Sequence, residues 1–234
     1  MKKVLKTALI YTFPVLIGYM FLGIAFGLLL QKAGYNYIWA FFISLFVYAG
    51  SMQFVLVDFF GSNLGLAIMA AMTLIINSRH IFYGLSFIDK FKKMGKLYPY
   101  MIFSLTDETY SILCSIEPPN EIDSDKLYFA IALLNQIYWI IGSVIGALAG
   151  ELITFNTTGI DFAMTALFVV IFVEQWKEFK SHIPALTGLS SAILCLILFG
   201  PNNFILPSLL ITVAFLLLIK NKIPVANNKE VSVP

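Results

Sequence analysis

The sequence has little charge. Only 12% of its 234 residues are charged, whereas 59% are hydrophobic, and the mean hydropathy is +0.87. A chain of this composition has too little polar surface for a soluble globule. We therefore expect an all-α polytopic membrane protein. Residues 1–222 form a single transmembrane domain in this prediction, and residues 223–234 form a polar C-terminal tail.

Reactive and metal-binding residues are also scarce. Cys114 and Cys195 both lie in apolar runs, where a thiol usually packs as a small hydrophobic side chain, so we expect neither a disulfide nor a metal site. The sequence has no Ser/His pair and no metal-spaced histidine cluster of the kind needed for hydrolysis. We expect a protein that is not an enzyme, needs no cofactor and binds no nucleic acid.

Hydropathy predicts about seven to eight hydrophobic segments, some of them broken or re-entrant. The segments cover residues 8–30, 37–60, 64–87, 98–116, 127–148, 162–173, 183–199 and 203–219. An unaided helix needs about 20 residues to cross roughly 30 Å of hydrocarbon. The segment at 162–173 is too short for that, which favours an interrupted structure in this part of the chain.

Loop charge gives a further constraint on topology. The basic N-terminus and the basic loop at 89–96 should both be cytoplasmic by the positive-inside rule. Three full crossings between them would forbid this arrangement. We therefore predict a break near Gly50-Ser51 or near Asn77-Ser78, with the acidic loop at 117–126 on the outer side.

The two halves of the chain share a short pattern. Leu45-Phe46-Val47 recurs as Leu167-Phe168-Val169, and Gln53 or Gln175 follows at the same spacing. The helix before each copy contains a Gly-x-x-x-Gly motif, at Gly23 to Gly27 and at Gly142 to Gly146, which permits close helix contact. Together these matches predict an inverted repeat, with copies at residues 8–88 and 127–219, as in alternating-access transporters.

Asp107 and Glu108 lie inside an apolar stretch, where a charge costs about 2.5 to 3.5 kcal/mol on insertion scales. Neighbouring residues of a helix are about 100° apart, so the two acids should have different partners, and we expect one of them to carry a proton. In a continuous helix Ser104, Asp107, Ser111 and Ser115 would share one face. The alternative is a pair of interfacial acids that cap a helix broken near Thr106.

The stretch from Tyr48 to Gln53 is a small and polar interruption in a Phe-rich helix. An unwound turn there would present backbone amides and carbonyls to a substrate, so Tyr48, Gly50, Ser51 and Gln53 are candidate substrate-binding residues. The alternative is that Gly50 and Ser51 permit close helix packing while Gln53 bonds to a neighbouring helix.

Asn77, Arg79 and His80 form a second polar group. Arg79 offers a planar fork that matches a carboxylate, so its natural partners are Asp107, Glu108 or the carboxylate of a ligand. Asn77 can hydrogen-bond a broken backbone. His80 is a candidate proton relay, although a lone histidine is more often a hydrogen-bonded packing residue.

Four motifs resemble one known family, the AzlC-type large subunit of branched-chain amino acid exporters, also called the BrnF type. The motifs are Tyr48-Ala-Gly-Ser-Met-Gln-Phe54, Asn77-Ser-Arg-His80 with Tyr83-Gly84, Thr106-Asp-Glu-Thr109, and Asp161-Phe-Ala-Met-Thr-Ala-Leu-Phe168. Their order and spacing match, and the resemblance runs through most of the chain.

The resemblance implies export of leucine, isoleucine, valine and often methionine from a bacterial cell. It also implies a multi-pass protein of the bacterial cytoplasmic (inner) membrane, a small AzlD-type membrane subunit as partner, and coupling to protons. The sequence has no Gly-x-x-x-x-Gly-Lys-Ser/Thr phosphate loop, which agrees with a secondary transporter. Two other classes stay open from the residues themselves: a small-solute or ion channel, and a non-transporting assembly subunit.

Overall fold

A computed structural model describes residues 2–62, 64–119, 121–152, 181–200 and 204–219, with single positions at 162, 165, 166, 169, 172, 173 and 176. The regular elements within these ranges are helices, and none of the described residues lies in a strand. The polar tail, Gln175 and most of the motif at 161–168 lie outside the described residues.

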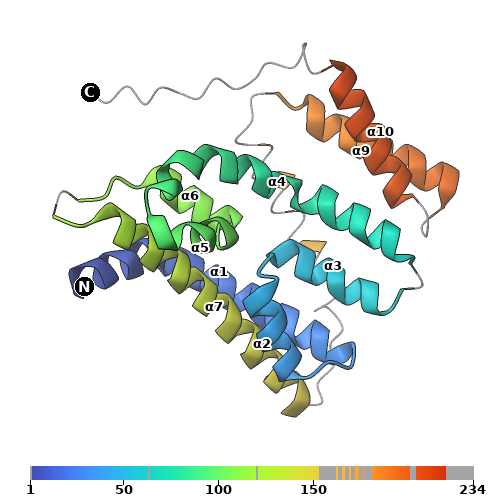
Figure 1. Ribbon diagram of the computed structural model, residues 1–234. Helices are drawn as coiled ribbons and strands as arrows, with labels where there is room; N and C mark the ends of the chain where they lie inside the picture. Colours follow the sequence, from blue (N-terminus) through green and yellow to red (C-terminus); the bar gives the residue numbers. More distant parts are fainter. Residues whose placement is uncertain are drawn as a thin grey trace. The chain divides into compact units, whose positions relative to one another are not determined.

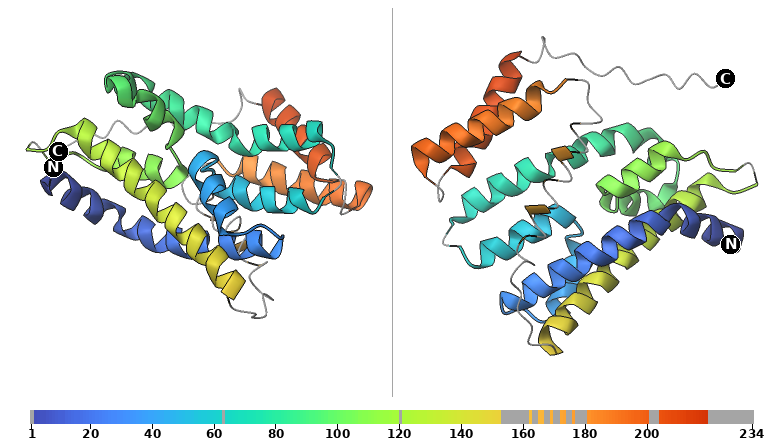
Figure 2. Two further views of the ribbon diagram at one scale, coloured as in Figure 1. Left: turned by 60° about the horizontal axis from the view of Figure 1, so that its bottom comes forward. Right: turned by 180° about the vertical axis from the view of Figure 1, so that it is seen from behind.

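Two long helices, α1 (Lys2–Lys32) and α7 (Ser124–Leu152), are apolar enough to cross a membrane, and they lie side by side (Figures 1 and 2). α4 (Leu66–Lys92) is a third described span if its two bent halves cross as one. At 1.5 Å per residue, α1 and α7 are each about 45 Å long, more than the hydrocarbon thickness. The described residues thus establish two to three spans, while the count of seven to eight segments stays a prediction.

The Gly-x-x-x-Gly motifs bring α1 and α7 into close contact, as predicted. A Cβ atom added to Gly27 would lie 2.1 Å from the Ser143 carbonyl oxygen, and one added to Gly146 would lie 2.1 Å from the Ile24 carbonyl oxygen. Only residues without a side chain allow the backbones to approach this closely.

The two helices run parallel. Lys3 Nζ lies 2.9 Å from Glu121 Oε2 near their beginnings, and Gly27 contacts Gly146 much farther along both. In an inverted repeat, the first helices of the two copies run antiparallel. If α1 and α7 began the two copies, they would therefore run in opposite directions. The inverted repeat over 8–88 and 127–219 is therefore not confirmed.

The predicted break near Gly50 is present. α2 (Tyr37–Phe46) and α3 (Gly50–Phe60) are separate helices, whereas α4 continues through Asn77 and Ser78. The rings of Tyr35 and Phe60 lie 4.3 Å apart, so the beginning of α2 and the end of α3 meet. Each helix is about 15 Å long, half the hydrocarbon thickness, and the pair forms a re-entrant hairpin.

A second hairpin consists of α5 (Tyr98–Phe103), which follows the short 3-10 helix η1 (Gly95–Leu97), and α6 (Asp107–Ser115). Because the helix is interrupted at residues 104–106, Ser104 does not share a helix face with Asp107, which corrects that part of the prediction, whereas Ser111 and Ser115 lie in α6 at i+4 and i+8 from Asp107. Tyr98 and Ile116, at the two ends of the hairpin, both pack against the apolar cluster that contains Leu127. The hairpin therefore enters from the end at which α7 begins.

The two hairpins enter from opposite ends of the α1/α7 pair, and their tips meet near its middle. Gln136 of α7 joins them: its Nε2 donates to the Leu45 carbonyl at 3.1 Å, and its Oε1 accepts from Tyr100 Oη at 2.8 Å. The rings of Tyr48 and Phe103, one from each tip, lie 6.2 Å apart. Two interrupted helices thus face each other at the level where a membrane would be most apolar.

The re-entrant α5/α6 hairpin also corrects the predicted topology. The Lys3–Glu121 ion pair places the acidic loop at 117–126 beside the N-terminus. Lys90 Nζ, near the basic loop, donates to Tyr128 Oη at 2.5 Å at the same end. The acidic loop was predicted on the outer side because the segment before it was taken to cross the membrane, but α5 and α6 turn back instead.

α9 (Ile183–Phe199) and α10 (Ile205–Ile219) belong to a second compact unit and pack antiparallel to each other. Ser191 Oγ hydrogen-bonds with Thr212 Oγ1 and donates to the Ser208 carbonyl at 3.4 Å. These bonds satisfy hydroxyl groups within an otherwise apolar helix pair, as expected for membrane helices.

Candidate functional site

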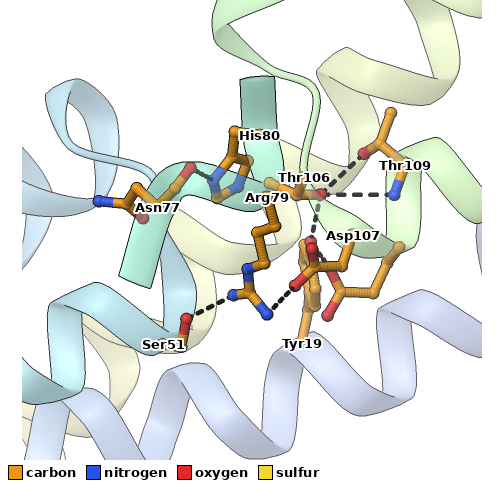
Figure 3. A network of polar contacts seen from close by, with 9 residues as sticks. Tyr19, Ser51, Asn77, Arg79, His80, Thr106, Asp107 and Thr109 are labelled. Atoms are coloured by element: carbon orange, nitrogen blue, oxygen red, sulfur yellow. Dashed lines mark hydrogen bonds and ion pairs between the residues drawn. The ribbon is translucent and has the colours of Figure 1, made fainter. Parts of the chain in front are cut away.

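Arg79 of α4 connects the two hairpin tips, as Figure 3 shows. Its Nη2 donates to Ser51 Oγ at 2.5 Å, and its Nη1 lies 2.9 Å from Asp107 Oδ2. The side chains of Arg79 and Asp107 are 21% and 31% exposed, so the ion pair is largely shielded. Arg79 is the only arginine in the sequence. One permanent positive charge therefore holds together two elements that come from opposite ends of the α1/α7 pair.

Ser51 and Asp107 both lie in the first turn of a helix. The amides at a helix N-terminus carry partial positive charge and favour an anion nearby. In α6, Thr106 caps this turn, since its Oγ1 accepts from the Thr109 amide at 3.4 Å. In α3, no side chain among the described residues caps the turn that begins at Gly50. The first turn of α3 thus keeps its capacity to bind a carboxylate.

Glu108 has a different partner from Asp107, as the sequence predicted. Tyr19 of α1 donates from its hydroxyl to Glu108 Oε2 at 2.6 Å, and the same hydroxyl lies 2.7 Å from Thr106 Oγ1. Thr106 Oγ1 in turn donates to Thr109 Oγ1 at 3.1 Å. The first acid of the pair is therefore ion-paired, whereas the second is hydrogen-bonded to a chain of hydroxyl groups.

Gln53 is fully buried, and both ends of its amide are occupied. Its Oε1 accepts from Trp139 Nε1 at 2.9 Å, and its Nε2 donates to Ser44 Oγ at 3.3 Å, across the break between α2 and α3. A Cβ atom on Gly50 would lie 3.5 Å from the Trp139 ring, an ordinary contact distance. For Gln53 these contacts match the packing alternative, in which the amide bonds to a neighbouring helix.

Tyr48 lies at the tip of the first hairpin with a φ of +39°, in the left-handed region that non-glycine residues seldom occupy. Such a backbone conformation costs about 1–3 kcal/mol and often marks a functional turn. The Tyr48 hydroxyl, Arg79 Nε and Asp107 Oδ1 are buried and have no hydrogen-bond partner among the described residues. Buried polar atoms are usually paired, so these three are available to a polar ligand.

Asn77 and His80 lie on α4 but do not join the ion pair. Figure 3 shows the Asn77 side chain directed away from the Arg79 guanidinium. His80 Nδ1 lies 3.3 Å from the Asn77 carbonyl oxygen, and the His80 ring packs edge-on against Tyr83 at 5.9 Å. These contacts match the interpretation of His80 as a hydrogen-bonded packing residue.

Sequence reasoning did not single out Tyr19, Thr106, Thr109, Asn135 or Trp139 as site residues. Asn135 Nδ2 donates to Thr109 Oγ1 at 2.9 Å, and the Tyr19 and Trp139 rings pack edge to face at 5.3 Å. The break near Thr106, which the sequence analysis gave as the alternative for the two acids, is present, and the Thr106-Asp-Glu-Thr109 pattern carries the matching N-cap signal. Tyr19 gives no such signal, because a single tyrosine in an apolar helix is ordinary.

Paired hairpins around a shielded ion pair, in a chain of long apolar helices, define a polytopic membrane protein of the kind that moves solutes. Residues 14–153 match the family described as AzlC protein. The chain is 41% identical over 228 residues to the branched-chain amino acid transport protein AzlC of Bacillus subtilis, covering 97% of this chain and 89% of that protein. The chain therefore belongs to the AzlC family, a membrane transport family and not a family of enzymes.

Other relatives carry less specific names. An uncharacterized membrane protein of Helicobacter pylori is 39% identical over 221 residues, covering 94% of this chain and 97% of that protein. The inner membrane protein YgaZ of Escherichia coli is 26% identical over 175 residues, covering 72% of this chain and 71% of that protein. No solved structure matches. These relatives and the apolar helices identify a multi-pass protein of the bacterial cytoplasmic membrane.

Proposed function

We propose that the protein is a secondary transporter that exports leucine, isoleucine, valine and methionine, driven by the proton gradient and working with a small AzlD-type membrane subunit. Membership of the AzlC family and the name of the Bacillus subtilis relative support the substrate class. The observation that carries the mechanism is the meeting of two interrupted helices at Arg79.

The substrate in this proposal is a zwitterion held between the hairpin tips. Its carboxylate binds the Arg79 fork, the first-turn amides of α3 at Gly50 and Ser51, and the Tyr48 hydroxyl. Its ammonium binds Asp107, whose Oδ1 has no partner among the described residues. The aliphatic tail lies against aromatic side chains of the tips, such as Phe103.

Binding of the zwitterion exchanges one ion pair for two. The substrate carboxylate takes the place of Asp107 at Arg79, and the freed Asp107 carboxylate then pairs with the substrate ammonium. Separation of Arg79 from Asp107 without substrate would leave two shielded charges unpaired, at a cost of about 3–5 kcal/mol. The ion pair therefore keeps the tips together until a molecule with both charges arrives.

The two hairpins provide a route to alternating access. Each spans about half of the hydrocarbon, so movement of one tip opens the site to one side while the other tip remains closed. In this proposal the α2/α3 and α5/α6 hairpins, which enter from opposite ends of the α1/α7 pair, provide the inverted symmetry that alternating access uses. The further hydrophobic segments, seven to eight in all, complete one transporter domain over residues 1–222.

The remaining predicted site residues take supporting roles. Gln53 holds the break between α2 and α3 in shape through Trp139 and Ser44. The His80 ring nitrogen Nδ1 lies within hydrogen-bonding distance of the Asn77 backbone carbonyl oxygen, on the same helix as Arg79. His80 stays a candidate relay for protons that reach this region.

Leucine flux in proteoliposomes tests the proposal, with labelled substrate, an imposed pH gradient, and the AzlD-type subunit present or absent. We expect saturable, gradient-dependent efflux that needs the subunit. Arg79→Lys keeps the charge but loses the fork, and Asp107→Asn removes the ion pair, so both should reduce efflux in normally inserted protein. Full efflux in both variants would contradict the site, and flux that does not saturate would favour a channel.

A further inference from the structure

Asp107 and Glu108, the two neighbouring acids in the first turn of α6, have different partners. This difference suits them to different roles. Asp107 is held in the ion pair with Arg79 at 2.9 Å. Glu108 makes no ion pair with any described residue and instead accepts the Tyr19 hydroxyl at 2.6 Å. We propose that Glu108 carries the transported proton, that Tyr19 is its positioning residue, and that Asp107 is reserved for the substrate. This assignment rests on the proposed transport function.

Geometry favours Glu108 as the proton carrier. A proton on Asp107 would remove the charge that faces Arg79 and leave the guanidinium without its anion. A proton on Glu108 breaks no ion pair, because the carboxyl group can keep Tyr19 as a partner in either protonation state. An ionised Glu108 accepts from Tyr19 Oη, and a protonated Glu108 can donate to the same oxygen.

The hydroxyl chain beyond Tyr19 can follow this change. With Glu108 ionised, Tyr19 donates to Glu108, and Thr106 donates to Thr109. With Glu108 protonated, the carboxyl donates to Tyr19, Tyr19 donates to Thr106, and Thr106 keeps its bond to Thr109. One proton is gained at Glu108, and the remaining hydroxyl hydrogens only rotate. The state of Glu108 is thereby transmitted to the cap of α6 at the tip of the second hairpin.

The surroundings of Glu108 contain few charges. Asp107 precedes it on α6, and Arg79 of α4 faces the pair. Among the residues that the structure describes, the other titratable groups that interact with it are two tyrosines, Tyr19 from α1 and Tyr48 from the first hairpin tip. Asp107 and Arg79 neutralise each other, so the charge change at Glu108 is felt mainly by hydroxyl groups.

Tyr19 also links the acid to the other hairpin. Its ring packs edge to face on Trp139, which donates to Gln53 behind the first break. Protonation of Glu108 therefore changes the hydrogen bonding of Tyr19, which contacts Trp139 near the first hairpin tip and Thr106 at the second. This placement gives Tyr19 a positioning role in proton coupling.

The test compares leucine exchange at equal pH with leucine flux driven by a pH gradient, in proteoliposomes that contain the protein and its small subunit. Glu108→Gln should keep exchange but lose the response to the gradient and to pH. Tyr19→Phe should keep both and move the pH midpoint of flux upward by about one unit, since the Tyr19 hydroxyl bonds the ionised carboxylate more strongly than the protonated carboxyl group. Tyr138→Phe is the matched control, because it removes a buried hydroxyl contact between α1 and α7, to Thr12 Oγ1 at 3.1 Å, away from the acids.

Each outcome decides the assignment. A Glu108→Gln protein that still responds to the gradient, or one that exchanges no leucine, would overturn the role of Glu108. A Tyr19→Phe midpoint equal to that of wild type and Tyr138→Phe would overturn the role of Tyr19. Wild-type protein that exchanges no leucine would instead refute the proposed function, and this inference with it.

Discussion

At the scale of single residues, the site depends on how each buried polar group is paired. Arg79 has two partners, Ser51 and Asp107, and each belongs to the first turn of a different helix. The sequence predicted that Arg79 pairs with an acidic residue, because an arginine in an apolar segment needs an anion. It could not predict which of the two adjacent acids pairs with Arg79, because that depends on the break at residues 104–106 and on the resulting orientation of α6.

The bond between Gln53 and Trp139 provides a residue-scale prediction. Gln53→Ala should leave the Trp139 indole N–H buried without an acceptor, at a cost of about 1–3 kcal/mol in the free energy of unfolding. Trp139→Phe should leave Gln53 Oε1 unpaired in the same way. Thermal unfolding of the solubilised single and double variants measures the coupling. We expect the double variant to lose less than the sum of the two, by about 0.5–3 kcal/mol, and strict additivity would show that the bond contributes nothing.

At the scale of helices, glycine contacts and helix breaks position the site. α1 and α7 approach closely at Gly27 and Gly146, and this pair presents Tyr19, Asn135 and Trp139 to the hairpin tips. The Gly-x-x-x-Gly motifs predicted the close contact correctly, because backbone approach requires only the absence of side chains. They did not predict the direction of the two helices, since the same motif serves parallel and antiparallel pairs.

Substitution of these glycines gives an element-scale prediction. Gly27→Ala and Gly146→Ala should separate α1 from α7, because the added Cβ atoms would lie 2.1 Å from backbone oxygens of the facing helix. Overpacking of this kind typically costs about 1–3 kcal/mol. Gly18→Ala is the matched control, since a Cβ atom there meets nothing within 4 Å. The thermal midpoint of solubilised protein should fall for the first two variants only, and an equal fall for Gly18→Ala would contradict the contact.

At the scale of the whole molecule, sidedness follows from the two re-entrant hairpins. The N-terminus, the basic loop and the acidic loop lie at one end of the α1/α7 pair, because α5 and α6 turn back before crossing. Their excess of lysine predicts that this end is cytoplasmic, by the positive-inside rule. Hydropathy alone counted residues 98–116 as a crossing, since a hairpin and a span have the same composition.

Cysteine labelling tests this topology. In a Cys114→Ala/Cys195→Ala background, Lys93→Cys and Glu121→Cys should react with a membrane-impermeant reagent only from the cytoplasmic side. Ala33→Cys, at the end of α1, is the matched position on the opposite side and should react only from outside. Labelling of inside-out vesicles measures access from the cytoplasmic side, and labelling of right-side-out vesicles measures access from outside. Labelling of Glu121→Cys from outside would show that α5 and α6 cross the membrane.

The sequence by itself determined the membrane class, the approximate ranges of the two long helices and a small set of candidate polar residues, and it limited the break to Gly50-Ser51 or Asn77-Ser78. These are local properties, because hydropathy, glycine spacing and the cost of a buried charge can be read without knowing the fold. Tertiary structure alone decided that Asp107 meets Arg79, that Glu108 meets Tyr19, and that α5 and α6 return to the side from which they came. These pairings depend on the direction and depth of each element, which are set by packing between residues far apart in the chain.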